Sequence, residues 1–361
     1  MFRYSRPDLV ERFESWWKHD LHGTPLMRVV ARSGVQLPPA PQPKDDAARY
    51  IDGNNIIANA KRCLATHEFM GDSFASVSGD IGPGSLALYL GSEPRFAPDT
   101  VWYEPCIADP ETHGQLAFDH ENRWWKLHTE LIRKLHDAAG DEFRVNIPDL
   151  IENIDIYAAM RGPQDALYDL MDYPELVSQY IAQIDDAYFE YYDALCDIVM
   201  DGEGVTSYTA FDILGRGRTA KIQCDFSAML SPAQYRKFVL PSLRKQTEKL
   251  NHSLYHLDGP DAIRHVPAIM ELDKLDALQW TCGAGQPDGA SPRWYGIYDQ
   301  VVAAGKSLWV QLYNGGVDDW IRGAESLMER YNPRIFYFHF PNMSMADAEK
   351  LIARAQAHWQ I

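Results

Sequence analysis

Cysteine is scarce in this sequence, and its placement excludes a cross-linked scaffold. The 361 residues include only five cysteines, which are far apart and form no Cys-x-x-Cys pair. A small secreted protein stabilised by disulfides would have a higher density of paired cysteines, so we expect reduced thiols here. We interpret Cys63, Cys106 and Cys196 as small buried hydrophobic side chains.

Long apolar runs and an excess of basic charge are also missing. No segment approaches the length of a membrane span, and the first residues contain no apolar run long enough for a signal peptide. The 34 basic and 51 acidic side chains give a net charge of −17, which repels phosphate backbones and anionic lipid surfaces. We therefore expect a cytoplasmic protein that binds neither nucleic acid nor a membrane.

Long linkers and nucleotide-binding loops are absent as well. No Gly/Ser-rich or Pro-rich stretch is long enough to separate two domains. The clusters Gly82-Pro83-Gly84 and Gly215-Arg216-Gly217 lack the spacing of a phosphate-binding glycine loop, and we interpret them as rim loops. One structural domain without a nucleotide site is the resulting expectation.

From about residue 74, short β-rich runs alternate with longer amphipathic segments, which is typical of βα units around a parallel sheet. Eight such runs predict an α/β fold of the (β/α)₈ TIM-barrel type over residues 73–361, with residues 1–72 as an N-terminal helical extension packed on the barrel. The predicted strands are 73–79, 143–147, 205–208, 222–226, 253–257, 277–282, 308–313 and 335–340.

Polar side chains gather where three of these strands end, which is where barrel enzymes hold their catalytic groups. Alternation with period two places the two members of each pair on one strand face, and we expect all three pairs to point inward together. The pairs are His256 with Asp258, Trp280 with Cys282, and Tyr337 with His339.

Two histidines, a carboxylate and a thiol are ligands that suit Zn²⁺, and imidazoles with an anionic partner can also perform acid/base catalysis. The residues alone do not choose between these functions. The competing structural interpretation makes His256 and His339 satisfied core histidines, Asp258 a helix cap and Cys282 a packing residue.

Other predicted strands also end in polar residues, which adds to the predicted rim. Asp149 could equally cap the following helix, and Asp225 could cap a turn. The remaining rim candidates are Asp80, Asn146, Tyr208, Cys224, Gln311, Tyr313 and Asn314.

Three stretches resemble the uroporphyrinogen decarboxylase superfamily: PDLIENIDIYAAMRGPQDALYDLMDYPE, CDFSAMLSPAQYRKFVLPSL and YHLDGPDAIRHVPAIMELDKLDALQW. This superfamily contains the decarboxylases and the cobalamin-dependent methyltransferases of methylamine and methanol metabolism, all on (β/α)₈ barrels. Asp80, in SGDIG, is similar to the decarboxylases' catalytic aspartate. Of their N-terminal Met-Arg-Gln-Ala-Gly-Arg motif, however, only Arg28 and Arg32 remain.

The methyltransferase branch binds zinc through a His-x-Cys pair and a later cysteine at the end of the last strand. The resemblance places His256 at the histidine, Asp258 at the first cysteine and His339 near the second, with Cys282 as an optional fourth ligand. Replacing thiolates by a carboxylate and an imidazole makes the metal a stronger Lewis acid, better suited to activating an oxygen.

The leading hypothesis is a zinc-dependent methyltransferase that demethylates a small methylated substrate toward a corrinoid carried by a partner protein. Two alternatives stay open: a cofactor-free decarboxylase or lyase that uses Asp80 and His339 on a carboxylated substrate, and a non-catalytic small-molecule-binding barrel. Members of the superfamily often form homodimers, although no feature of this sequence requires one. The candidate catalytic residues are Asp80, Tyr208 and Cys282, and the candidate substrate-binding residues are Asn146, Asp149, Trp280, Gln311, Tyr313 and Tyr337.

Overall fold

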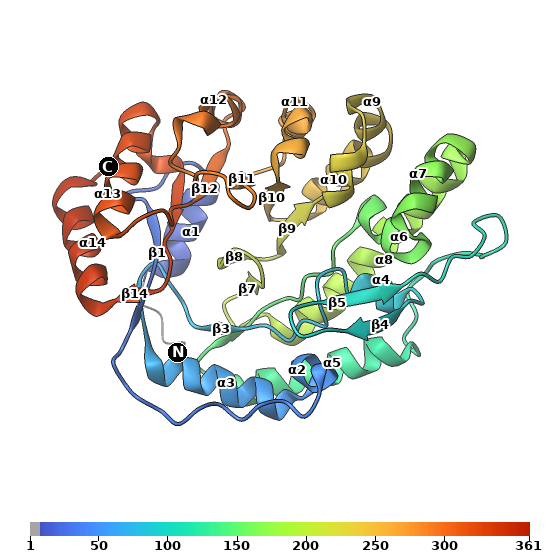
Figure 1. Ribbon diagram of the computed structural model, residues 1–361, viewed down its shortest axis with the longest axis horizontal. Helices are drawn as coiled ribbons and strands as arrows, with labels where there is room; N and C mark the ends of the chain where they lie inside the picture. Colours follow the sequence, from blue (N-terminus) through green and yellow to red (C-terminus); the bar gives the residue numbers. More distant parts are fainter. Residues whose placement is uncertain (1–7) are drawn as a thin grey trace.

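The computed structural model describes residues 8–361 as an α/β fold around a mostly parallel sheet (Figure 1). Its main sheet has the strand order β14-β1-β13-β12-β11-β10-β9, and every neighbouring pair on this path is parallel. β2 adds to β1 in the antiparallel direction. The strands are β1 (Leu26–Arg32), β2 (His67–Gly71), β9 (Thr219–Gln223), β10 (His252–Asp258), β11 (Ala277–Thr281), β12 (Ser307–Gln311), β13 (Phe336–His339) and β14 (Met343–Ser344).

Three smaller groups of strands accompany the main sheet. β3 (Ser76–Val77) is parallel to β6 (Arg144–Val145), and an isolated parallel bridge from Ile147 to Tyr208 links this pair to β7 (Val205–Tyr208). β7 forms a hairpin with β8 (Ile213–Arg216), and β4 (Glu93–Phe96) forms another with β5 (Val101–Glu104). The strand ladders described for residues 8–361 leave these groups as separate sheets, so they do not by themselves show a closed barrel.

Each of the eight predicted strand segments overlaps a strand of the structure, namely β3, β6, β7, β9, β10, β11, β12 and β13, although the boundaries of β9, β10 and β12 differ by up to three residues. The helices between them follow the predicted alternation, and Figure 1 shows α10 to α14 along the outer side of β9 to β13. The helices are α1 (Leu9–Trp17), α2 (Asp46–Ile51), α3 (Gly53–Thr66), α4 (Leu86–Tyr89), α5 (Arg123–Ala139), α6 (Asn153–Arg161), α7 (Pro163–Asp172), α8 (Pro174–Val199), α9 (Pro232–Gln234), α10 (Leu240–Lys249), α11 (Val266–Ile269), α12 (Tyr295–Ala303), α13 (Val317–Arg330) and α14 (Met345–His358).

The segment predicted as a helical extension also contributes strands to the main sheet. β1 lies inside that sheet, between β13 and β14, so the sheet begins well before residue 73. The reason is local, because LMRVVAR is an apolar, partly β-branched run that fits a buried strand.

Helix α1 covers the end of the sheet where the strands begin. The Trp16 indole donates a hydrogen bond to the carbonyl of Ile335, just before β13, at 2.8 Å. Phe13 and Trp16 pack edge-on against Tyr337, with ring centroids 5.4 and 5.7 Å apart. The opposite end, where the parallel strands finish, is left for polar side chains. Among residues 8–361 no helix has the length and apolar character needed to cross a bilayer.

Candidate functional site

Three potential metal ligands meet where β9 and β10 end. One ligand atom from each of Asp225, His256 and Asp258 lies within 4.8 Å of the others. The parallel pairing of β9 with β10 brings them together, because Asp225 lies two residues beyond Gln223, the last residue of β9, and His256 pairs with Gln223. His256 and Asp258, which were predicted to share a strand face, thus lie close together, with Asp225 as a third member.

His256 is held in a form that can bind a cation. Its Nδ1 lies 2.5 Å from the Gln279 amide oxygen, so Nδ1 is assigned the proton and Nε2 keeps its lone pair. Burial lowers the pKa of His256, and the positive charge of Lys221 lowers it further. The imidazole is therefore neutral at neutral pH, which is the state that metals bind.

The two carboxylates of this cluster crowd one another. Burial raises the pKa of Asp258, and the charge of Asp225 acts in the same direction. Asp155 fixes the turn that carries Asp225, since its carboxylate accepts hydrogen bonds from the backbone N–H groups of Asp225 and Phe226 at 2.8 and 2.9 Å. Two carboxylates and one imidazole on short, supported segments form a preorganised set of oxygen and nitrogen donors.

His339 belongs to a different cluster, which corrects its prediction as a metal ligand. Its Nε2 lies 3.1 Å from the Asp212 carboxylate, and Arg28 donates to the same carboxylate oxygen at 2.7 Å. Although burial acts to raise it, the hydrogen bonds and charges of His339 and Arg28 lower the pKa of Asp212 to about 2. His339 thus has a carboxylate partner of its own and is not part of the Asp225 cluster.

Two aromatic rings stand between the histidines. Phe211 packs against His256 with ring centroids 5.0 Å apart and against Trp309 at 5.2 Å, and Trp309 packs against His339 at 4.7 Å. Phe211 and Asp212 both have positive φ, 67° and 49°, in a loop that the residues around it hold in place. The Trp309 indole donates to the Phe211 carbonyl at 2.9 Å, and the Tyr337 hydroxyl donates to the Asp212 carbonyl at 3.0 Å.

Trp280 and Cys282 lie on the other face of their strand, which corrects both predictions. Gln279 reaches His256 and also donates to the Thr281 hydroxyl at 3.0 Å, so Gln279 and Thr281 form the inward face of β11. Trp280 instead packs against Trp294, with ring centroids 5.1 Å apart. Cys282 is buried, and burial raises the pKa of its thiol to about 12, so it remains a protonated packing residue.

A third polar cluster contains several of the predicted rim residues. The Tyr208 hydroxyl donates to Asp149 at 3.2 Å, and the Lys221 ammonium forms an ion pair with the same carboxylate at 2.8 Å. The backbone N–H of Asp149 donates to the Asp80 carboxylate at 2.8 Å, and the Thr209 hydroxyl donates to it at 2.6 Å. Burial raises the pKa values of Asp80 and Tyr208. Asp80, Asp149 and Tyr208 thus meet as predicted rim residues, around a lysine that sequence analysis missed.

The remaining predicted substrate-binding residues differ in their access to this region. The Asn146 amide donates to the Ser76 hydroxyl at 3.1 Å beside the third cluster. Gln311 pairs in register with His339, and the half-exposed Tyr313 donates its backbone N–H to Asp288 at 3.0 Å. Tyr337 is 0% exposed against α1 and cannot contact a substrate, which corrects its assignment.

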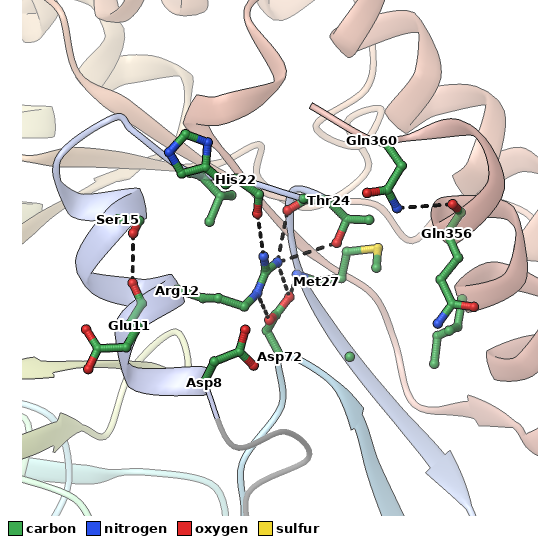
Figure 2. A pocket seen from close by; sticks show the side chains of 14 residues that line it. Asp8, Glu11, Arg12, Ser15, His22, Thr24, Met27, Asp72, Gln356 and Gln360 are labelled. Atoms are coloured by element: carbon green, nitrogen blue, oxygen red, sulfur yellow. Dashed lines mark hydrogen bonds and ion pairs between the residues drawn. The ribbon is translucent and has the colours of Figure 1, made fainter.

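Another cavity lies away from these clusters. It has a volume of about 750 Å³ between α1, the start of β1 and α14, and Figure 2 shows Arg12 at its centre. Arg12 donates to the Asp72 carboxylate at 2.5 Å and to the carbonyls of His22 and Thr24 at 2.8 and 2.9 Å. This cavity is at the end covered by α1, and none of the predicted site residues lines it, so we do not assign the chemistry to it.

Comparison with known proteins adds no further assignment. No protein-family model matches the chain, and no curated protein matches it. The functional assignment therefore depends on the geometry of the Asp225 cluster and on the resemblance of the three sequence stretches.

Proposed function

We propose that this protein is a metal-dependent enzyme that binds a divalent cation through Asp225, His256 and Asp258. The observation that carries the proposal is the convergence of these three donors within 4.8 Å at the ends of two adjacent parallel strands. Three protein ligands with an open position are typical of catalytic Zn²⁺ sites, in which imidazole and carboxylate ligands both occur.

The donor set fits such an ion on three counts. The His256 imidazole is neutral, and its Nδ1 is oriented by the Gln279 amide oxygen, as an outer acceptor orients a metal-binding histidine. Asp225 and Asp258 repel one another, and a bound cation would relieve that repulsion. Asp225 takes the place that the resemblance gave to His339 or Cys282.

The reaction we propose is removal of a methyl group from a small methylated compound, with a corrinoid on a separate protein as acceptor. The resemblance to the methyltransferase branch supports this choice of reaction. A bound divalent cation would act as a Lewis acid on the heteroatom that carries the methyl group. Lys221 supplies a positive charge close to His256: burial lowers the pKa of Lys221, but the charge of the Asp149 carboxylate raises it.

We further propose that the two groups of parallel strands close into a (β/α)₈ barrel. The bridge from Ile147 to Tyr208 extends the β3–β6 pair to β7, and β7 packs against β9 at the edge of the main sheet. A closed sheet would bring the third polar cluster around Lys221, the Asp225 cluster and the His339 cluster to one mouth, where barrel enzymes hold their active sites.

Elemental analysis of the purified protein tests the metal site. We expect about one zinc per chain in the wild type and its loss in His256→Ala and Asp225→Ala, because each removes one of three ligands. His339→Ala is the matched control and should keep the metal, since His339 bonds to Asp212. Metal loss in His339→Ala alone, or a metal-free wild type, would refute the proposed site.

The cofactor-free decarboxylase remains a second candidate, and Lys221 is the observation that favours it. A buried ammonium close to the rim could bind a substrate carboxylate in exchange for Asp149. The predicted acid/base groups Asp80 and His339 belong to different hydrogen-bonded clusters, however. Chelation separates the candidates, since the decarboxylase keeps full activity without metal and the proposed methyltransferase loses it.

A further inference from the structure

A mostly apolar cavity of about 450 Å³ lies next to the Asp225 cluster and shares Asp225 with it. Its walls come from the β4–β5 hairpin, from α6 and from the short 3₁₀ helix η1 (Asp225–Met229), while β5 packs against α6. A cavity of this size beside a candidate reactive centre can hold a small organic group. The question is which chemistry its lining would accept.

The charged residues that line the cavity are both acidic. Asp155 and Asp225 contribute carboxylates, and the described lining residues include no lysine, arginine or histidine. Backbone N–H groups at Asp225 and Phe226 hold Asp155 at the edge of this space. An anionic ligand would be repelled, and a neutral apolar ligand would desolvate two carboxylates without compensating either charge.

Aromatic side chains supply the second feature of the lining. Trp102, Tyr103 and Phe226 all contribute to the walls. The Tyr103 hydroxyl donates to the Ile81 carbonyl at 2.9 Å, so its hydrogen-bonding group is already engaged and its ring remains for the cavity. Trp102 is 56% exposed, so its ring is accessible to a ligand that enters the cavity. Aromatic rings combined with carboxylates are the setting in which proteins bind alkylated ammonium groups.

We propose that this cavity binds an alkylated ammonium group. The further step, that this group is the non-reacting end of the substrate, rests on the proposed function. A divalent cation would offset the charges of Asp225 and Asp258, and Asp155 would still offer one negative charge to a monovalent cation. The substrate would then carry an ammonium in the cavity and, at its other end, the heteroatom with the transferable methyl group near His256.

Isothermal titration calorimetry with two probes of the same shape tests this inference on the full chain. Choline carries the charged ammonium, and 3,3-dimethylbutan-1-ol replaces its nitrogen by carbon. We expect choline to bind at least about tenfold more tightly than the alcohol, because only the cation gains from the carboxylates and rings. Trp102→Leu and Asp155→Asn should each weaken choline binding by about tenfold. Tyr168→Leu is the control, since Tyr168 is an aromatic side chain of similar exposure, 50%, that does not line the cavity.

The outcomes separate this inference from the proposed function. Equal affinity for the two probes, no choline binding, or choline binding that Trp102→Leu leaves intact would overturn the ammonium site. Asp155 also supports the turn of Asp225, so Trp102→Leu is the deciding variant. Choline selectivity in a protein that binds no metal would keep the cavity assignment and remove the metal-dependent reaction. A metal-loaded protein without choline selectivity would keep the metal site and remove the ammonium site.

Discussion

The ion pair between Lys221 and Asp149 allows a quantitative test of the polar network near the proposed mouth. The two side chains are 2% and 14% exposed, and the ammonium lies 2.8 Å from the carboxylate. Burial raises the pKa of Glu152 well above its ordinary value, which disfavours a second negative charge beside Lys221. Each charge of the pair therefore depends mainly on the other.

Lys221→Met removes the ammonium and leaves the Asp149 carboxylate with the Tyr208 hydroxyl as its remaining described side-chain donor. Breaking a buried pair from one side costs about 3–5 kcal/mol, and we expect about 3 kcal/mol here because Tyr208 still donates. Asp149→Asn should cost about 2 kcal/mol, since the ammonium keeps the Gln223 amide oxygen. The double variant contains neither charge, so its loss should be about 3 kcal/mol rather than 5.

Urea denaturation of the four proteins at pH 7 measures these differences as a double-mutant cycle. We expect a coupling energy of about 2 kcal/mol. Losses that add to within about 0.5 kcal/mol would show that the two charges do not depend on each other, which would refute this account of the network.

Two further predictions concern groups outside the proposed metal site. Burial raises the pKa of Asp185 to about 7, although the Ser242 hydroxyl donates to it at 2.6 Å. Because the pKa of Asp185 is higher in the folded than in the unfolded state, the protonated Asp185 contributes its full stability below about pH 4. This contribution to the free energy of unfolding is lost as the pH rises toward 7. Asp185→Asn should therefore stabilise the fold at pH 8 by about 2 kcal/mol and have little effect at pH 4, and equal thermal shifts at the two pH values would contradict this. Cys282→Ala should keep the full metal content and lower the unfolding free energy by about 1 kcal/mol, measured by elemental analysis and urea denaturation, whereas loss of the metal would return Cys282 to the site.

The positions of eight strands along the chain could be predicted because the β-rich runs that form them are short, apolar and bounded by helix starts. β1 was missed although LMRVVAR has the same character, because the run lies before the Pro-rich segment 37–44 and was grouped with the N-terminal helices. Lys221 could have been recognised as a lysine in the centre of a buried strand, since such a side chain requires a partner. Its partner, Asp149 in the loop between β6 and α6, could not be deduced from one sequence.

The strand face that points into the site could not be predicted from the sequence. Period two establishes that Trp280 and Cys282 share a face, but only the bond between Gln279 and His256 shows that this face points outward. The hydrogen-bond partner of His339 is Asp212, which lies in a loop where Phe211 and Asp212 adopt left-handed backbone conformations. Neither residue type favours that conformation strongly enough to be predicted, and tertiary contacts enforce it.

Charge balance is the reason for which we propose the cation at Asp225 and not at His339. Asp149 has Lys221 as its countercharge, and Asp212 has Arg28. Asp225 and Asp258 stand close together, and neither forms an ion pair with a lysine or arginine among the described residues. Two carboxylates beside a neutral imidazole, with no lysine or arginine of the described residues in an ion pair with either, form a donor set whose charge a divalent cation would balance.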